Sequence, residues 1–185
     1  MERSTIFAGF GGQGILFAGQ VLARAAMAEG REVLWIPSYG PEMRGGTASC
    51  TVIVGDEPIG SPVVDWADAA VVLNPPSLAK FEPLVAPGGL LVVNTSLIEA
   101  EPTRTDIEVL PVPCTAVARE AGDDRLVSLV ALGALVARRS WVSPAAVREA
   151  MTEQLGEERA RVLAADLAAF EAGLRAATEV TAVRR

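Results

Sequence analysis

The segment TIFAGFGGQG at positions 5–14 decides the fold class of this chain, because it places a short apolar run directly before a glycine turn. The following residues, 15–29, are rich in Ala, Leu and Val and end at Gly30, which predicts a helix with a glycine C-cap. Residues 32–36 predict a second strand that stops at Pro37. This order of strand, glycine turn, helix and strand predicts a βαβ unit.

The glycine turn satisfies the pattern G-x-G-x-x-G and is a candidate anion site. Glycine permits positive φ angles and lets a ligand approach the backbone closely. The start of the following helix offers free N–H groups and a partial positive charge, which suit a phosphate or a carboxylate. The candidate binding residues are Gly9, Gly11, Gly12, Gln13 and Gly14.

Three interpretations of this turn stay open. A dinucleotide site needs an acidic residue at the end of the second strand, where the sequence has Pro37 and Ser38, so NAD binding is the least favoured. The glycines could instead only pack the strand against its helix. The favoured interpretation is that the turn binds another anionic group, in a site shared with a partner subunit.

A second glycine-rich loop, SYGPEMRGGT at 38–47, follows the second strand. Because the carboxyl ends of the strands form the ligand edge of an open α/β sheet, we expect this loop beside the glycine turn. A guanidinium there can hold a phosphate or carboxylate through two hydrogen bonds, or it can pair with the nearby glutamate and stabilise the loop. The candidate binding residues are Ser38, Tyr39, Glu42, Arg44, Gly45, Gly46 and Thr47.

The rest of the chain alternates strands with helices and then becomes helical. Strands are predicted at 48–54, 69–73, 90–93 and 107–112, and helices at 76–85, 115–120, 126–138 and 157–177, with one more helix capped by Ser143 and Pro144. Cys50, Val52 and Val54 share one face of their strand. The alternation predicts an α/β domain with a mainly parallel sheet, helices on both faces and a helical C-terminal third.

The length of 185 residues predicts a single domain over 1–185, with a core at about 5–140 and a helical extension at 141–185. Half of the residues are apolar, which is enough for a sizeable core. The longest nearly apolar run, 126–137, is shorter than the roughly 20 residues that span a bilayer, and the first residues lack a signal-peptide pattern. We expect a cytoplasmic protein without a membrane segment.

Residue usage excludes several kinds of chemistry. There is no histidine, so the Ser-His and Cys-His nucleophile systems are absent from this chain. Two cysteines, Cys50 and Cys114, are too few for an iron–sulfur cluster, and we expect both to be reduced and buried. A net charge of −7 with Lys80 as the single lysine argues against nucleic-acid binding. We assign no catalytic residue and no metal ligand.

The two glycine-rich segments resemble the paired signatures of the gamma subunit of 2-oxoacid:ferredoxin oxidoreductases of the 2-oxoglutarate, 2-ketoisovalerate and pyruvate type. Three more segments match: VGDEPI at 54–59, NPPSLAKF at 74–81 and PGGLL at 87–91. The resemblance is close over 5–98 and loose through 129–134. The second loop is more similar to the 2-oxoglutarate and branched-chain enzymes than to the indolepyruvate enzyme, which favours 2-oxoglutarate as substrate.

The resemblance implies a Rossmann-like three-layer domain inside a complex that oxidatively decarboxylates a 2-oxoacid, forms an acyl-CoA and reduces ferredoxin. It implies alpha and beta partners, and a ferredoxin-like delta partner, that carry thiamine diphosphate, Mg²⁺ and iron–sulfur clusters. This domain is associated with coenzyme A in related fused enzymes. A thiamine diphosphate–Mg²⁺ site of this family needs Gly-Asp-Gly followed at a distance by paired asparagines. Here Gly55-Asp56 is followed by Glu57, and only two asparagines, Asn74 and Asn94, are present. We therefore expect the chain to bind none of these cofactors alone.

Two other functions stay open. The chain could be a stand-alone nucleotide-binding oxidoreductase, which the glycine turn alone would suggest. It could also be a non-enzymatic module that holds a phosphorylated small molecule. Homodimerisation of the isolated chain is likewise undecided by the sequence.

Overall fold

The computed structural model describes residues 1–38, 47–155, 160–180 and 183–184. Its strands are β1 (Glu2–Phe10), β2 (Glu32–Ser38), β3 (Thr47–Gly55), β4 (Ala67–Val72), β5 (Val85–Asn94), β6 (Glu108–Val112) and β7 (Val183–Arg184). Its helices are α1 (Ile15–Ala28), α2 (Pro75–Phe81), α3 (Cys114–Glu120), α4 (Val127–Arg138), α5 (Pro144–Leu155) and α6 (Ala160–Glu179), with short 3₁₀ helices at Glu82–Leu84 and Asp124–Leu126.

The strands form one mixed sheet in the order β2-β3-β1-β4-β5-β6-β7. The neighbours β1, β4, β5 and β6 pair in parallel, whereas β3 is antiparallel to both β1 and β2, and β7 is antiparallel to β6. Strand β2 therefore runs in the same direction as β1 without touching it. The predicted α/β domain with helices on both faces is confirmed, but the sheet is mixed, with three parallel and three antiparallel pairs of strands. The predicted βαβ outline is present as β1, α1 and β2, but β3 lies between the two strands, so they do not pair with each other.

The burial of β2 and β3 explains this order. Strand β3 alternates residues between two covered faces, and Cys50, Val52 and Val54 all enter the same core, as predicted. Strand β2 is only partly buried along its centre and carries Pro37 at the free edge of the sheet. Proline is tolerated on an edge strand, since its missing N–H costs no ladder hydrogen bond there. The prediction that Pro37 stops the strand is consequently wrong, and β2 continues to Ser38.

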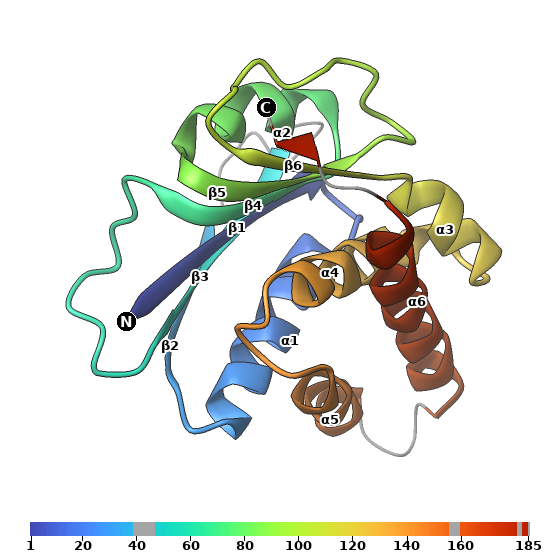
Figure 1. Ribbon diagram of the computed structural model, residues 1–185. Helices are drawn as coiled ribbons and strands as arrows, with labels where there is room; N and C mark the ends of the chain where they lie inside the picture. The colour runs from blue at the N-terminus through green and yellow to red at the C-terminus, as the bar shows by residue number, and fades with distance from the viewer. Residues whose placement is uncertain (39–46, 156–159, 181–182, 185) are drawn as a thin grey trace.

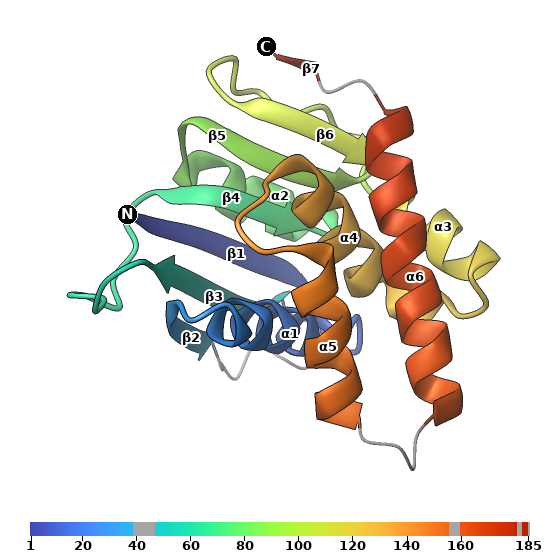
Figure 2. The same ribbon diagram turned by 60° about the horizontal axis from the view of Figure 1, so that its bottom comes forward.

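Helices cover the two faces of the sheet unequally. Helices α1, α3, α4, α5 and α6 pack on one face and share the larger hydrophobic core, which Figures 1 and 2 show as a thick helical layer. Helix α2 covers the opposite face, where a smaller core includes Leu78 and Phe81. The helical C-terminal third is thus part of the main core, and α6 packs against α4 (Figure 2).

Two glycines allow α4 and α6 to cross closely. A Cβ atom on Gly173 would lie 2.0 Å from the carbonyl oxygen of Val130, and one on Gly133 would lie 2.2 Å from that of Phe170. These distances are far inside van der Waals contact, so neither position accepts a side chain without moving a helix. Both helices were predicted from the sequence, but their close crossing was not.

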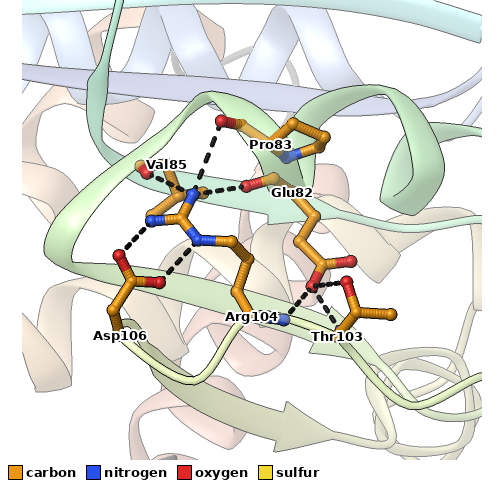
Figure 3. Close-up of polar contacts among 6 residues, drawn as sticks. All are labelled: Glu82, Pro83, Val85, Thr103, Arg104 and Asp106. Atoms are coloured by element: carbon orange, nitrogen blue, oxygen red, sulfur yellow. Dashed lines mark hydrogen bonds and ion pairs between the residues drawn. The ribbon is translucent and has the colours of Figure 1, made fainter.

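A polar cluster ties the segment before β6 to the end of α2 (Figure 3). Glu82 Oε1 accepts hydrogen bonds from the backbone N–H groups of Thr103, at 2.5 Å, and Arg104, at 2.7 Å. The Arg104 guanidinium donates to the Val85 carbonyl at 2.9 Å and to both carboxylate oxygens of Asp106. These bonds hold the connection between β5 and β6 near the face that carries α2.

The predicted helix boundaries are mostly close to the observed ones. The cap at Ser143 is confirmed, because its Oγ accepts a hydrogen bond from the Ala146 N–H at 3.1 Å, and α5 begins at Pro144. The helix predicted at 76–85 is shorter and gives way to the 3₁₀ turn and β5. The last helix is described from Ala160, and residues 157–159 of the prediction lie outside the described residues. Strand β7 was not predicted.

Candidate functional site

The candidate site lies at the carboxyl end of the parallel strands, between β1 and β4. The chain leaves β1 toward α1 on one face of the sheet, and it leaves β4 toward α2 on the other face (Figure 1). Such a change of direction between neighbouring parallel strands opens a crevice, and ligands of open α/β sheets bind there. The glycine turn at 9–14 follows β1 and lies at this place.

The backbone of the turn needs its glycines for two different reasons. Gly12 and Gly14 adopt φ angles of 93° and 74°, which side chains disfavour. Gly9 needs its missing side chain for space, since a Cβ there would lie 2.6 Å from Gln13 Oε1. That Oε1 accepts a hydrogen bond from the Phe10 N–H at 2.6 Å, so Gln13 closes the turn.

The turn is open on its outer side. Nothing lies within 4 Å of the position that a Cβ of Gly12 would occupy, and Phe10 is 39% exposed. Helix α1 begins at Gly14 without a side-chain cap, and it has no acidic residue in its first turn. The N–H groups at the start of an uncapped helix are donors in need of acceptors. The geometry therefore suits an anionic ligand, although binding by these residues stays a prediction.

The ends of the second glycine-rich loop lie beside the turn, as expected from their position after β2. Thr47 pairs with Phe10 across β3 and β1, and Ser38 pairs with Ser49 across β2 and β3. Both ends are therefore at the same sheet edge as the glycine turn. The remaining predicted residues, Tyr39, Glu42, Arg44, Gly45 and Gly46, lie outside the described residues.

Two asparagines mark the neighbouring strand ends and differ in how their side chains are bonded. Asn94, after β5, donates to the Leu73 carbonyl and to Thr115 Oγ1 and accepts from two backbone N–H groups. Asn74, after β4, accepts from the Ser77 N–H at 2.8 Å, but its buried Nδ2 has no partner in the described part of the chain. Buried polar groups are rarely left unpaired. Asn74 is therefore a site candidate that the sequence analysis missed.

The buried cysteines are not reactive groups. Burial raises the pKa of the Cys50 thiol and that of the Cys114 thiol to about 12, so both stay protonated. Both are free and buried, as predicted. Within the described ranges, no three His, Cys, Asp or Glu side chains are grouped so that they could hold a metal ion. No helix in that part of the chain has the length and apolar character to cross a membrane.

The arginine pair at the end of α4 has a structural role. Arg138 and Arg139 both bind the carboxylate of Glu108, which is only 7% exposed at the start of β6. Burial alone would raise the pKa of Glu108, but the hydrogen bonds from the two arginines lower it below its usual value. These arginines therefore fix α4 to the sheet.

Comparison with known proteins defines the class to which this fold and turn belong. Residues 4–176 match the model of the family described as pyruvate ferredoxin/flavodoxin oxidoreductase. The chain belongs to this family. The resemblance to gamma subunits expected from the two glycine-rich segments is confirmed.

Three individual proteins illustrate the similarity. The ketoisovalerate oxidoreductase subunit VorA of Methanothermobacter thermautotrophicus is 45% identical over 130 residues, which cover 70% of this chain and only 27% of VorA. The gamma subunit of a keto/oxoacid ferredoxin oxidoreductase from Geobacter sulfurreducens has a TM-score of 0.84 and 28% identity, covering 96% of this chain and 99% of that one.

The third is the 2-oxoglutarate:ferredoxin oxidoreductase of Magnetococcus marinus, solved with 2-oxoglutarate, coenzyme A and succinyl-CoA bound. It has a TM-score of 0.87 and 27% identity over 97% of this chain, but the match covers only 32% of that chain. This chain thus corresponds to a whole gamma subunit in one relative and to about a third of a longer chain in others.

Proposed function

We propose that this chain is the gamma-type subunit of a 2-oxoacid:ferredoxin oxidoreductase, and that it contributes assembly and coenzyme A binding. The observation that carries this proposal is the match of nearly the whole chain to a separate gamma subunit and to about a third of one chain of the Magnetococcus enzyme. A domain that occurs both alone and fused to larger chains acts together with those chains. We propose 2-oxoglutarate as the substrate, because that enzyme was solved with 2-oxoglutarate bound.

The glycine turn supplies the proposed contact with coenzyme A. The phosphates of coenzyme A are anions. The uncapped start of α1 presents N–H donors and a partial positive charge, and the missing side chain of Gly12 leaves the neighbouring backbone accessible. The chain would hold and orient the phosphates through these donors, with Arg44 as a further contact. It supplies no acid or base to the reaction in this proposal.

The thiamine and iron–sulfur chemistry is assigned to partner subunits, because the residues of this chain do not fit those groups. Asp56, in the Gly-Asp pair that a thiamine site would use, binds the N-terminal ammonium at 2.9 Å and Arg31 at 2.8 Å. The two cysteines are buried, protonated thiols. The proposed partners are therefore alpha and beta subunits and a ferredoxin-like delta subunit, with ferredoxin as electron acceptor.

The proposed contact is tested by calorimetry of coenzyme A binding to the assembled complex. Gly12→Val should raise the dissociation constant at least tenfold, because its side chain occupies the open space above the turn. Gly30→Val is the matched control, since Gly30 has nearly the same φ angle, 75° against 93°, and equally open surroundings at the other end of α1. Equal affinities for the two variants would remove the glycine turn from the coenzyme A site.

Arg44 can be tested in the same assay. Arg44→Ala should weaken coenzyme A binding by roughly 1.5–3 kcal/mol, the contribution of a charged hydrogen bond. An unchanged affinity would show that Arg44 does not contact the ligand.

A further inference from the structure

Asp166 is a buried carboxyl group that has no partner among the described residues. It lies on α6, is 4% exposed and lines a cavity of about 260 Å³ whose lining also includes Gly14, the last residue of the glycine turn. Within the described residues it makes no hydrogen bond and no ion pair. A buried charge is normally paired, so an unpaired one facing a cavity requires an explanation.

The neighbouring groups do not neutralise this carboxyl. Arg125 also lines the cavity, but its guanidinium binds both carboxylate oxygens of Asp123, at 2.6–3.0 Å, and its side chain is 80% exposed. Ser128, a third polar residue of the lining, has no hydrogen-bonding partner in the described part of the chain. Burial raises the pKa of Asp166 to about 6, so the group is mostly ionised at neutral pH.

The other walls of the cavity are apolar. Phe17 comes from the first turn of α1, Leu126 and Leu129 come from the start of α4, and Leu155 ends α5. Such walls suit an aliphatic stem, while Asp166 and Ser128 offer a hydrogen-bond acceptor and a hydroxyl at one place. The cavity thus has mainly apolar walls and one carboxylate, that of Asp166, which has no partner in the described part of the chain.

We propose that this cavity binds a cationic nitrogen group, an ammonium or a guanidinium on a short aliphatic stem, with Asp166 as its counter-ion. A cation is favoured over an anion because Arg125 is already paired with Asp123, whereas Asp166 has no partner in the described part of the chain. The stem would lie against the apolar walls. Gly14, at the end of the glycine turn, also lines this cavity, but the proposed counter-ion Asp166 takes no part in the coenzyme A proposal.

The test follows the backbone amides of the full chain by NMR at about pH 7.5, where Asp166 is ionised. The probe is n-propylguanidinium, and the neutral n-propylurea and the anion butyrate serve as matched controls. Propylguanidinium should shift the Gly14, Ser128 and Leu129 amides saturably, and the two controls should not. Asp166→Asn should lower the affinity at least tenfold, as expected for the loss of a charge-assisted bond.

Two more variants complete the design. Glu171 is on the same helix, but its carboxylate pairs with Arg148 outside the cavity. Glu171→Gln should therefore leave the affinity unchanged. Leu155→Trp fills the cavity without altering Asp166 and should also weaken binding tenfold or more. The proposal is overturned by equal binding to wild type and Asp166→Asn, by a stronger response to butyrate, or by no saturable shift at all.

The assembled complex distinguishes two sources of the cation, both of which support the site. If a lysine or arginine side chain of a partner subunit occupies it, propylguanidinium no longer binds in the complex, and Asp166→Asn weakens assembly. If the ligand is a free small cation, propylguanidinium binds the complex as tightly as it binds the isolated chain.

Discussion

Gly14 combines two constraints at a single residue, and the two can be measured separately. Its φ angle of 74° disfavours any side chain, and a Cβ there would also lie 2.6 Å from Ser128 Oγ. A left-handed residue costs roughly 1–2 kcal/mol. Gly30 has a φ angle of 75° and open surroundings, so it carries only the first constraint.

Gly14→Ala should therefore destabilise the chain by about 2–3 kcal/mol, and Gly30→Ala by about 1 kcal/mol. Replacing Ser128 by Ala removes the contact and should recover about 1 kcal/mol in the double variant. Urea denaturation of the four variants measures these differences. Equal losses for Gly14→Ala and Gly30→Ala would contradict the assigned contact.

Asp166 predicts a pH dependence of stability. Its pKa is raised from 3.8 to about 6 in the folded chain, so the folded state binds more protons than the unfolded state between these values. The contribution is fully present below pH 3.8 and is lost as the pH rises through about 6. Between these two pH values the chain should lose about 3 kcal/mol of stability, because each unit of the pKa shift corresponds to about 1.4 kcal/mol.

The Asp166→Asn variant isolates this effect, because Asn cannot ionise. The difference in unfolding free energy between variant and wild type should grow in favour of the variant from about pH 4 to pH 7. Arg125, the one charged neighbour in the lining of the cavity, is paired with Asp123 and should not change the sign. A difference that does not vary with pH would show that the carboxyl is not desolvated.

At the scale of elements, the crossing of α4 over α6 depends on Gly133 and Gly173. Gly173→Ala places a Cβ 2.0 Å from a backbone oxygen that cannot move alone, so it should destabilise the chain by about 2–4 kcal/mol. Gly60→Ala, which meets nothing within 4 Å, is the matched control and should change stability by less than about 0.5 kcal/mol. Thermal unfolding of both variants checks this, and similar melting temperatures would refute the close crossing.

The cluster in Figure 3 predicts unequal effects for two partners of one ion pair. Arg104→Ala removes the pair with Asp106 and also the bond to the Val85 carbonyl, so it should cost about 1–2 kcal/mol. Asp106→Ala removes only an exposed pair and should destabilise the chain much less. Chemical denaturation compares them, and a larger loss for Asp106→Ala would mean that the backbone contacts of Arg104 contribute nothing.

Most elements could be predicted from sequence because their signals are local. The glycine turn, the apolar strand runs and the cap at Ser143 depend on neighbouring residues. The position of β3 between β1 and β2 could not be predicted, since strand order depends on contacts distant in sequence. Pro37 led to a wrong prediction of where β2 ends. A proline is tolerated within this strand only because β2 lies at the edge of the sheet, and the edge position depends on the strand order.

In the whole molecule, some features of the candidate site could be predicted from sequence and others could not. The proximity of the two glycine-rich segments followed from their positions at strand ends, and the pairing of Phe10 with Thr47 agrees with it. Asn74 and Asp166 were missed because no sequence pattern shows that the Asn74 Nδ2 and the Asp166 carboxyl group have no hydrogen-bonding partner among the described residues. The buried Asp166 sits in a helix of alternating charge and alanine and looks like a surface residue.

Affinity isolation of the tagged chain from its native cells under anaerobic conditions shows whether the chain works as a subunit. Stoichiometric partners carrying thiamine diphosphate and iron–sulfur clusters should accompany it, and the isolate should reduce ferredoxin with a 2-oxoacid and coenzyme A. A chain that elutes alone with a bound nucleotide, or that oxidises a 2-oxoacid without partners, would show that it is not such a subunit.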